Sequence, residues 1–124
     1  MGIVMKENVL RDKSYSFALR IVKLHQYLSA EKREFILSKQ VLRSGTSIGA
    51  NIEEANHGQS KLDFIHKLSI AQKESFETHY WLRLLRDSGY IEPKLTHSLL
   101  SDCEEIQKII TASIITAKKS LNKN

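Results

Sequence analysis

Turn-forming residues are scarce in this chain, and their scarcity restricts the folds that it can adopt. Proline occurs once, at Pro93, and glycine five times among 124 residues. A sheet of several strands needs many turns, which glycine and proline commonly form, and runs of β-branched and aromatic residues. A helical protein needs only a few connections between long segments. The sequence therefore predicts an all-α fold.

Apolar residues recur every three or four positions along four long segments, which is the spacing of one face of an α-helix. In the first segment the stripe consists of Phe17, Ile21, Leu24 and Leu28. We expect helices at about residues 12–28, 31–57, 61–88 and 93–121. Helices of this length joined by short loops predict an antiparallel up-down-up-down four-helix bundle, with residues 1–124 as a single domain.

Capping residues mark the expected helix ends. Asp12 and Ser29 are suited to cap the first and second helices, and Ser60 is suited to cap the third. Gly89 follows the last turn of the third helix, and Pro93 opens the fourth. The placement of Ser29 leaves only one or two residues between the first two helices.

Composition restricts the cellular setting. Cys103 is the single cysteine, so the chain forms no internal disulfide and no four-thiolate zinc site, which fits a reducing compartment. The first residues lack the apolar run of a signal peptide, and no segment approaches the length of a membrane span. We expect a cytoplasmic protein that does not enter membranes.

The positive charge is concentrated in the first third of the chain. The net charge is +5, and residues 1–43 hold nine Lys or Arg against four Asp or Glu, whereas residues 44–124 hold ten of each. Such asymmetry indicates an acidic partner such as nucleic acid, although a solvated basic face has the same composition. The sequence shows no aromatic stacking platform interleaved with these cations, so base-specific binding is not expected. The candidate nucleic-acid-binding residues are Arg11, Lys13, Arg20, Lys23 and Arg43.

The stretch SGTSIGANIEEA, residues 44–55, contains two glycines four positions apart. A P-loop would need a preceding strand and a Lys-Ser or Lys-Thr pair after the second glycine, and neither is present. Glycine inside a helix costs about 1 kcal/mol relative to alanine, so a close helix contact is the better explanation. The residues predicted to lie at a helix-packing or subunit interface are Gly45, Gly49, Asn51, Glu54, Tyr80 and Trp81.

Two incomplete motifs raise catalytic alternatives. Glu54 and His57 have the spacing of a di-iron half-site, but the only candidate second pair, Asp63 and His66, crowds the same end of the bundle. The spacing between Arg20 and His25 is that of HEPN-type ribonucleases, in which histidine transfers a proton and arginine stabilises phosphate charge. We expect no metal, no cofactor and no enzymatic activity.

Three stretches, KSYSFALRIVKLHQYL, LSKQVLRSGTSIGANIEEA and DFIHKLSIAQKESFETHYWLRLL, resemble the 23S rRNA intervening-sequence protein family, which consists of small bacterial four-helix bundles. The resemblance covers about residues 8–120, and SGTSIGAN is its most specific part. It implies a homo-oligomeric ring, with a pentamer favoured, and no established enzymatic activity. Asn51 and Glu54 match positions of the family's characteristic stretch. A similar bundle, the accessory protein of diversity-generating retroelements, binds a reverse transcriptase and nucleic acid.

The leading hypothesis is therefore a non-enzymatic, oligomeric helical scaffold that binds RNA or DNA non-specifically through its basic face. Recruitment of a protein partner such as a reverse transcriptase belongs to the same hypothesis. Two alternatives stay open. One is a HEPN-like ribonuclease or toxin component, and the other is a protein-only adaptor whose basic face meets an acidic protein.

Overall fold

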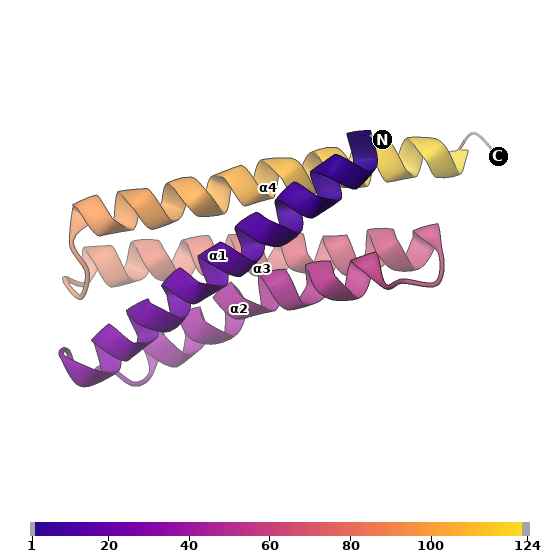
Figure 1. Ribbon diagram of the computed structural model, residues 1–124. Coiled ribbons are helices and arrows are strands. Elements are labelled where there is room, and N and C mark those ends of the chain that lie inside the picture. The colour runs from indigo at the N-terminus through magenta and orange to yellow at the C-terminus, as the bar shows by residue number, and fades with distance from the viewer. Residues whose placement is uncertain (1, 123–124) are drawn as a thin grey trace.

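The computed structural model describes the backbone of residues 2–122 and the side chains of residues 9–122. Its regular elements are four α-helices: α1 (Gly2–Ala30), α2 (Leu37–Asn56), α3 (Lys61–Asp87) and α4 (Pro93–Asn122). Each helix runs antiparallel to the next one in the chain, so the start of α1 and the end of α4 lie at the same end of the protein (Figure 1). The predicted all-α fold is confirmed.

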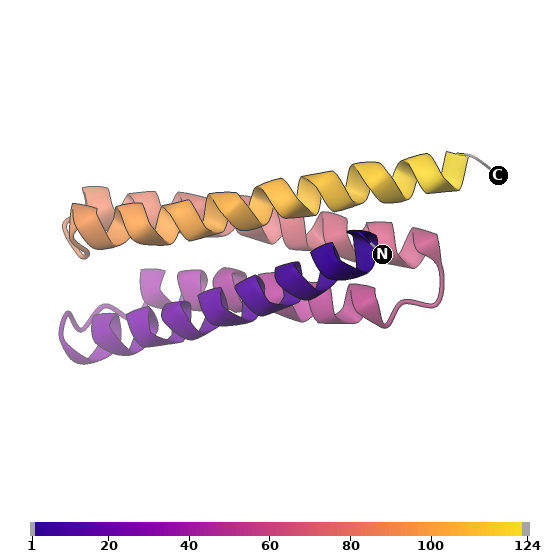
Figure 2. The ribbon, with the colours of Figure 1, turned by 45° about the horizontal axis from the view of Figure 1, so that its top comes forward.

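The helices pack around a shared core in chain order. α1 contacts α2, α2 contacts α3, α3 contacts α4, and α4 returns to contact α1. Within residues 2–122 the two diagonal pairs, α1 with α3 and α2 with α4, make no such contact. Figure 2, turned from the view of Figure 1, shows the same order and shows α1 and α4 separating toward the C-terminal end of α1. The arrangement is an up-down bundle of four helices.

The core is aliphatic except for Phe17, and all four helices contribute to it. It includes the four residues of the first stripe, each of which is at most 5% exposed. The largest fully buried side chains are Leu10, Phe17, Ile21, Leu28, Ile48, Ile52, Leu68, Leu82, Leu85, Leu99, Ile106 and Ile110. Burial of aliphatic side chains at this spacing is the main force that holds the helices together.

α1 begins at Gly2, well before the predicted start at about residue 12. The physical reason is Leu10, which is 2% exposed and lies seven positions before Phe17 on the same stripe. Asp12 therefore sits inside the helix on its exposed face and does not cap it.

The connection between α1 and α2 covers residues 31–36, so the prediction of a second helix from residue 31 was wrong. α1 continues through Ser29, and the chain then turns with Arg33 at a φ of 51° while the Glu34 amide donates to the Leu28 carbonyl at 2.9 Å. The first turn of α2 is capped by the Glu34 carboxylate, which accepts a hydrogen bond from the Ser38 amide at 2.9 Å. An acidic group at this position also matches the positive end of the helix dipole. Ser29, predicted as the cap, instead keeps its hydroxyl buried.

The end of α1 lies two residues beyond the prediction, and the end of α2 and both boundaries of α3 and α4 lie within one residue of it. Ser60 caps α3 by accepting a hydrogen bond from the Asp63 amide at 3.1 Å. Gly89 follows α3 with a φ of 82°, a conformation that glycine adopts without strain, and Pro93 is the first residue of α4.

Candidate functional site

The glycine-containing stretch lies in the middle of α2 and packs against α1. A Cβ atom placed on Gly45 would lie 2.9 Å from both γ carbons of Ile21, which is closer than carbon atoms can approach. A Cβ on Gly49 would lie 3.5 Å from the carbonyl oxygen of Ser14, an ordinary contact. Both glycines thus face a helix of the same chain. The stretch contains no loop that could cradle a phosphate.

The opposite side of the same stretch faces α3 through small polar groups. Ser44 and Thr78 are fully buried, and their hydroxyl oxygens lie 2.9 Å apart. Thr78 Oγ1 also lies 2.8 Å from the carbonyl oxygen of Glu74. Because a hydroxyl has one hydrogen, Thr78 can donate to this carbonyl and accept from Ser44, which satisfies both side chains.

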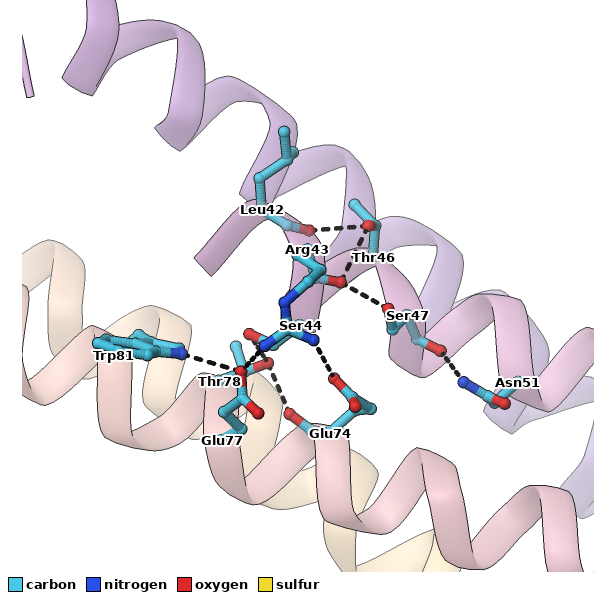
Figure 3. A network of polar contacts seen from close by, with 10 residues as sticks. All are labelled: Leu42, Arg43, Ser44, Thr46, Ser47, Asn51, Glu74, Glu77, Thr78 and Trp81. Carbon is cyan, nitrogen blue, oxygen red and sulfur yellow. Dashed lines mark hydrogen bonds and ion pairs between the residues drawn. The ribbon is translucent and has the colours of Figure 1, made fainter. Parts of the chain in front are cut away.

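Figure 3 shows that Arg43 extends from α2 toward α3. Its guanidinium group contacts the carboxylates of Glu74, at 3.3 Å, and Glu77. Glu77 also accepts a hydrogen bond from the indole nitrogen of Trp81 at 3.1 Å. Trp81 is half-buried at the edge of the core, and the half-exposed Tyr80 ring lies edge-on to it, with centroids 5.1 Å apart. The network joins α2 to α3. Arg43 is therefore directed toward α3 and does not extend the group of cations on α1.

Asn51 and Glu54 make ordinary polar contacts on α2. The Asn51 amide nitrogen donates to the Ser47 carbonyl at 2.8 Å, and Glu54 pairs with Lys67 of α3 at 2.8 Å. Within the described residues, no group of three or more His, Cys, Asp or Glu side chains is placed to hold a metal ion. Glu54 and His57 are therefore not joined by a further ligand of these types in the described part of the chain.

Three of the four candidate cations on α1 are paired with carboxylates of neighbouring helices. Arg20 Nη1 lies 2.6 Å from Asp102 Oδ2, and Lys13 contacts Glu105, both on α4. Arg11 lies 3.9 Å from Glu53 of α2. Lys23 is exposed and makes no ion pair among residues 9–122. The positive charge of α1 is thus partly neutralised within the protein.

Arg20 and His25 point toward different helices. The guanidinium group of Arg20 reaches α4, whereas His25 Nδ1 lies 3.3 Å from the Ser38 carbonyl oxygen at the start of α2. A five-residue step on a helix turns the chain by about 140°, which explains the divergence. The two side chains do not converge on one reacting phosphate within this chain.

Cys103 is fully buried in α4, and its thiol lies 3.3 Å from the Ser75 carbonyl oxygen. Burial, and to a smaller extent the neighbouring carboxylates Glu104 and Asp102, raise the pKa of the Cys103 thiol to about 12. The thiol is therefore protonated at neutral pH and is a poor nucleophile.

The structure shows two exposed apolar faces, of which the sequence analysis had named only Tyr80 as a candidate interface residue. On α1, Tyr15 is 65% exposed and Leu19 is half-exposed; on α3, Phe76 is 56% exposed and lies one turn before the half-exposed Tyr80. Ile115 of α4 lies beside Phe76 along a shallow groove. Each pair is spaced by four residues and falls outside the core stripe, and this off-stripe spacing was a usable signal.

None of the described helices combines the length and the apolar character that a membrane crossing requires. The family model described as 23S rRNA-intervening sequence protein matches residues 6–112. A crystal structure of a protein of unknown function from the S23 ribosomal protein family of Bacteroides thetaiotaomicron is 53% identical to this chain. The match covers 88% of this chain and 97% of that one, with a TM-score of 0.87. Among curated proteins, none matches the sequence.

Proposed function

This chain belongs to the 23S rRNA-intervening sequence protein family, and from that membership we propose that it is an oligomeric helical scaffold and not an enzyme. The scaffold binds RNA or DNA without sequence preference. Recruitment of a protein partner such as a reverse transcriptase remains a prediction from the resemblance.

The observation that carries the proposal is the pair of apolar faces on diagonal helices. We define the α1 face as Tyr15 and Leu19, and the α3 face as Phe76, Tyr80 and Ile115. Because α1 and α3 occupy diagonal corners of the bundle, the exposed Tyr15 and Leu19 lie on a different side of the protein from the exposed Phe76 and Tyr80. Covering large exposed apolar side chains is favourable at about 25 cal/mol per Å².

A contact between two different faces of identical chains is heterologous, and repeating it around a closing rotation gives a ring. The α1 face of one copy therefore packs on the α3 face of the next. The pentamer that the family resemblance implies is one closed form of this contact. In such a ring every α1 face and every α3 face is covered by a neighbouring copy, so neither face remains exposed to bind further copies.

The assembly proposal is tested with one charged substitution on each face. Size-exclusion chromatography with light scattering should show an oligomer for the wild-type protein and folded monomers for Leu19→Glu and Phe76→Glu. Ile36→Glu is the matched control, since Ile36 is 75% exposed in the α1–α2 connection and belongs to neither face. Circular dichroism checks that each variant is folded.

Mixing the two monomeric variants distinguishes a heterologous contact from a symmetric one. Each variant keeps one intact face, and the intact α1 face of Phe76→Glu can pack on the intact α3 face of Leu19→Glu. The mixture should therefore form a heterodimer and stop there. A monomeric wild-type protein, or face variants that assemble as the wild type does, would contradict the proposal.

The nucleic-acid part of the proposal is supported by the excess of Lys and Arg in residues 1–43 and by Lys23, which has no ion-pair partner among the side chains of residues 9–122. Phosphate binding releases condensed counterions, so affinity should fall steeply and linearly on a log-log plot against salt concentration. Fluorescence anisotropy with several labelled oligonucleotides of unrelated sequence should give similar affinities at each salt concentration. A strong preference for one sequence, or no salt dependence, would contradict it.

A further inference from the structure

A hollow of about 300 Å³ lies in the seam between α1 and α4, at the end where the two helices separate. Its floor is apolar, because Leu24 and Leu99 are almost fully buried. Its rim is formed by Tyr27 of α1, which is 40% exposed, and by Leu95 of α4, which is 39% exposed. The remaining lining residues are Arg20 and Lys23. We call this hollow the Tyr27 slot.

The two charged residues that line the Tyr27 slot are cations. Lys23 and Arg20 line it, and no carboxylate is among its lining residues in the described part of the chain. Arg20 uses Nη1 to bind Asp102 and retains other N–H donors. Lys23 lies about one helical turn before Tyr27 along α1, and Arg20 lies about two turns before it.

The next hollow along the same seam has the opposite character. It is lined by the carboxylates of Asp12, Asp102 and Glu105, with Lys13 as its cation. Lys13 is already paired with Glu105. An anionic ligand is therefore attracted to the Tyr27 slot and repelled from its neighbour, although both lie between the same two helices.

We infer that the Tyr27 slot binds an unpaired nucleotide of single-stranded RNA or DNA. The base stacks on the Tyr27 ring over the floor of Leu24 and Leu99, and its phosphate pairs with the Lys23 ammonium group and the remaining Arg20 donors. The inference rests on the proposed nucleic-acid binding and specifies its ligand. Stacking on an aromatic ring needs a base that is free of its partner, so single strands bind better than duplexes.

Fluorescence anisotropy with a labelled oligothymidine and a duplex of the same length tests this site. We expect the single strand to bind more tightly than the duplex. Tyr27→Leu should weaken single-strand binding about tenfold, within the range measured for base-stacking residues. It should leave duplex binding unchanged, and Tyr27→Phe, which keeps the ring, should bind as the wild type does. Tyr27 is partly exposed, so both variants should fold.

Lys23→Gln and Lys13→Gln form a matched pair on the same helix. Lys23→Gln should weaken binding and reduce the salt slope by about one, as expected for the loss of one phosphate contact. Lys13→Gln should lower the affinity and the salt slope less than Lys23→Gln does, because Lys13 lies in the acidic hollow and is paired with Glu105.

The outcomes separate this inference from the function on which it rests. If Tyr27→Leu binds the single strand as tightly as the wild type does, or if the duplex binds as tightly as the single strand, the slot does not hold a base. The proposed non-specific binding of nucleic acid is then retained. If thymidine monophosphate binds as tightly as the oligomer, the slot is a mononucleotide site and the assignment to strands is overturned. If neither oligonucleotide binds, the proposed nucleic-acid function fails as well.

Discussion

Alanine substitution at the two glycines of α2 should have different effects on stability, although both replace glycine in the middle of the same helix. Each substitution gains about 1 kcal/mol of helix propensity. At Gly49 the new Cβ lies 3.5 Å from the Ser14 carbonyl oxygen and needs no adjustment. Gly49→Ala should therefore be more stable than the wild type by up to about 1 kcal/mol, or roughly 4 °C in Tm.

At Gly45 the new Cβ lies 2.9 Å from two carbons of Ile21 and 3.3 Å from its Cβ. Ile21 is fully buried and branched at Cβ, so its side chain has no free rotamer to adopt. Overpacking of this kind costs about 1–3 kcal/mol, which offsets or exceeds the propensity gain. We expect Gly45→Ala to be less stable than Gly49→Ala by about 1–3 kcal/mol.

Urea denaturation followed by circular dichroism measures both variants, at one fixed protein concentration because assembly would shift the midpoint. A double-mutant cycle with Ile21→Ala isolates the contact, since that change removes both γ carbons. In the Ile21→Ala background, Gly45→Ala should become stabilising. Equal stabilisation by the two glycine substitutions, or additive effects of Gly45→Ala and Ile21→Ala, would refute the reasoning.

Three further predictions concern the Ser60 cap, the buried Cys103 thiol and the ribonuclease alternative. Ser60→Ala removes the acceptor of the Asp63 amide and should lower the free energy of unfolding by about 1 kcal/mol, whereas Ser98→Ala on the exposed side of α4 should not lower it. The pKa of Cys103 is raised from 9.0 to about 12, so the unfolded chain loses this proton first as the pH rises. The wild type should therefore lose about 1.4 kcal/mol of stability per pH unit between about pH 9 and 12 relative to Cys103→Ala, and rapid reaction of the native thiol with Ellman's reagent would contradict its burial. RNA incubated with the purified protein should stay intact on a denaturing gel, and cleavage abolished by His25→Ala would favour the ribonuclease alternative.

Most of the fold could be predicted because its strongest signals are local. The stripe from Phe17 to Leu28 and the Ser60 cap each depend on residues within one or a few turns of a helix. The α1–α2 connection could not be predicted in the same way. The first turn of α2 is capped by Glu34, which accepts from the Ser38 amide and lies outside the helix. The turn places Arg33 at a positive φ, a conformation that glycine favours and that an arginine in the sequence does not indicate.

The interface glycines were predictable as a pair but not individually. Their spacing indicated a close helix contact, yet the sequence gives no measure of the distance to the facing side chain. Only the structure distinguishes Gly45, which excludes a methyl group, from Gly49, which has room for one. The contacts of Trp81 were also only partly predictable. Its hydrogen-bond partner Glu77 lies one turn away on the same helix, but Arg43, which binds the same carboxylate, comes from α2.

The charge available to a phosphate also depends on distant residues. Arg11, Lys13 and Arg20 all find carboxylates on α2 or α4, and no local spacing rule predicts such pairs between helices. Exposed ion pairs contribute at most about 1 kcal/mol each, so a phosphate can displace a carboxylate from them. The exchange gains little, however, because one anion replaces another. Lys23 has no ion-pair partner in the part of the chain whose side chains the structure describes, so phosphate binding at Lys23 breaks no ion pair there. The same charge removal should therefore matter more at Lys23 than at Lys13, even though both belong to the excess of positive charge in the first third of the chain.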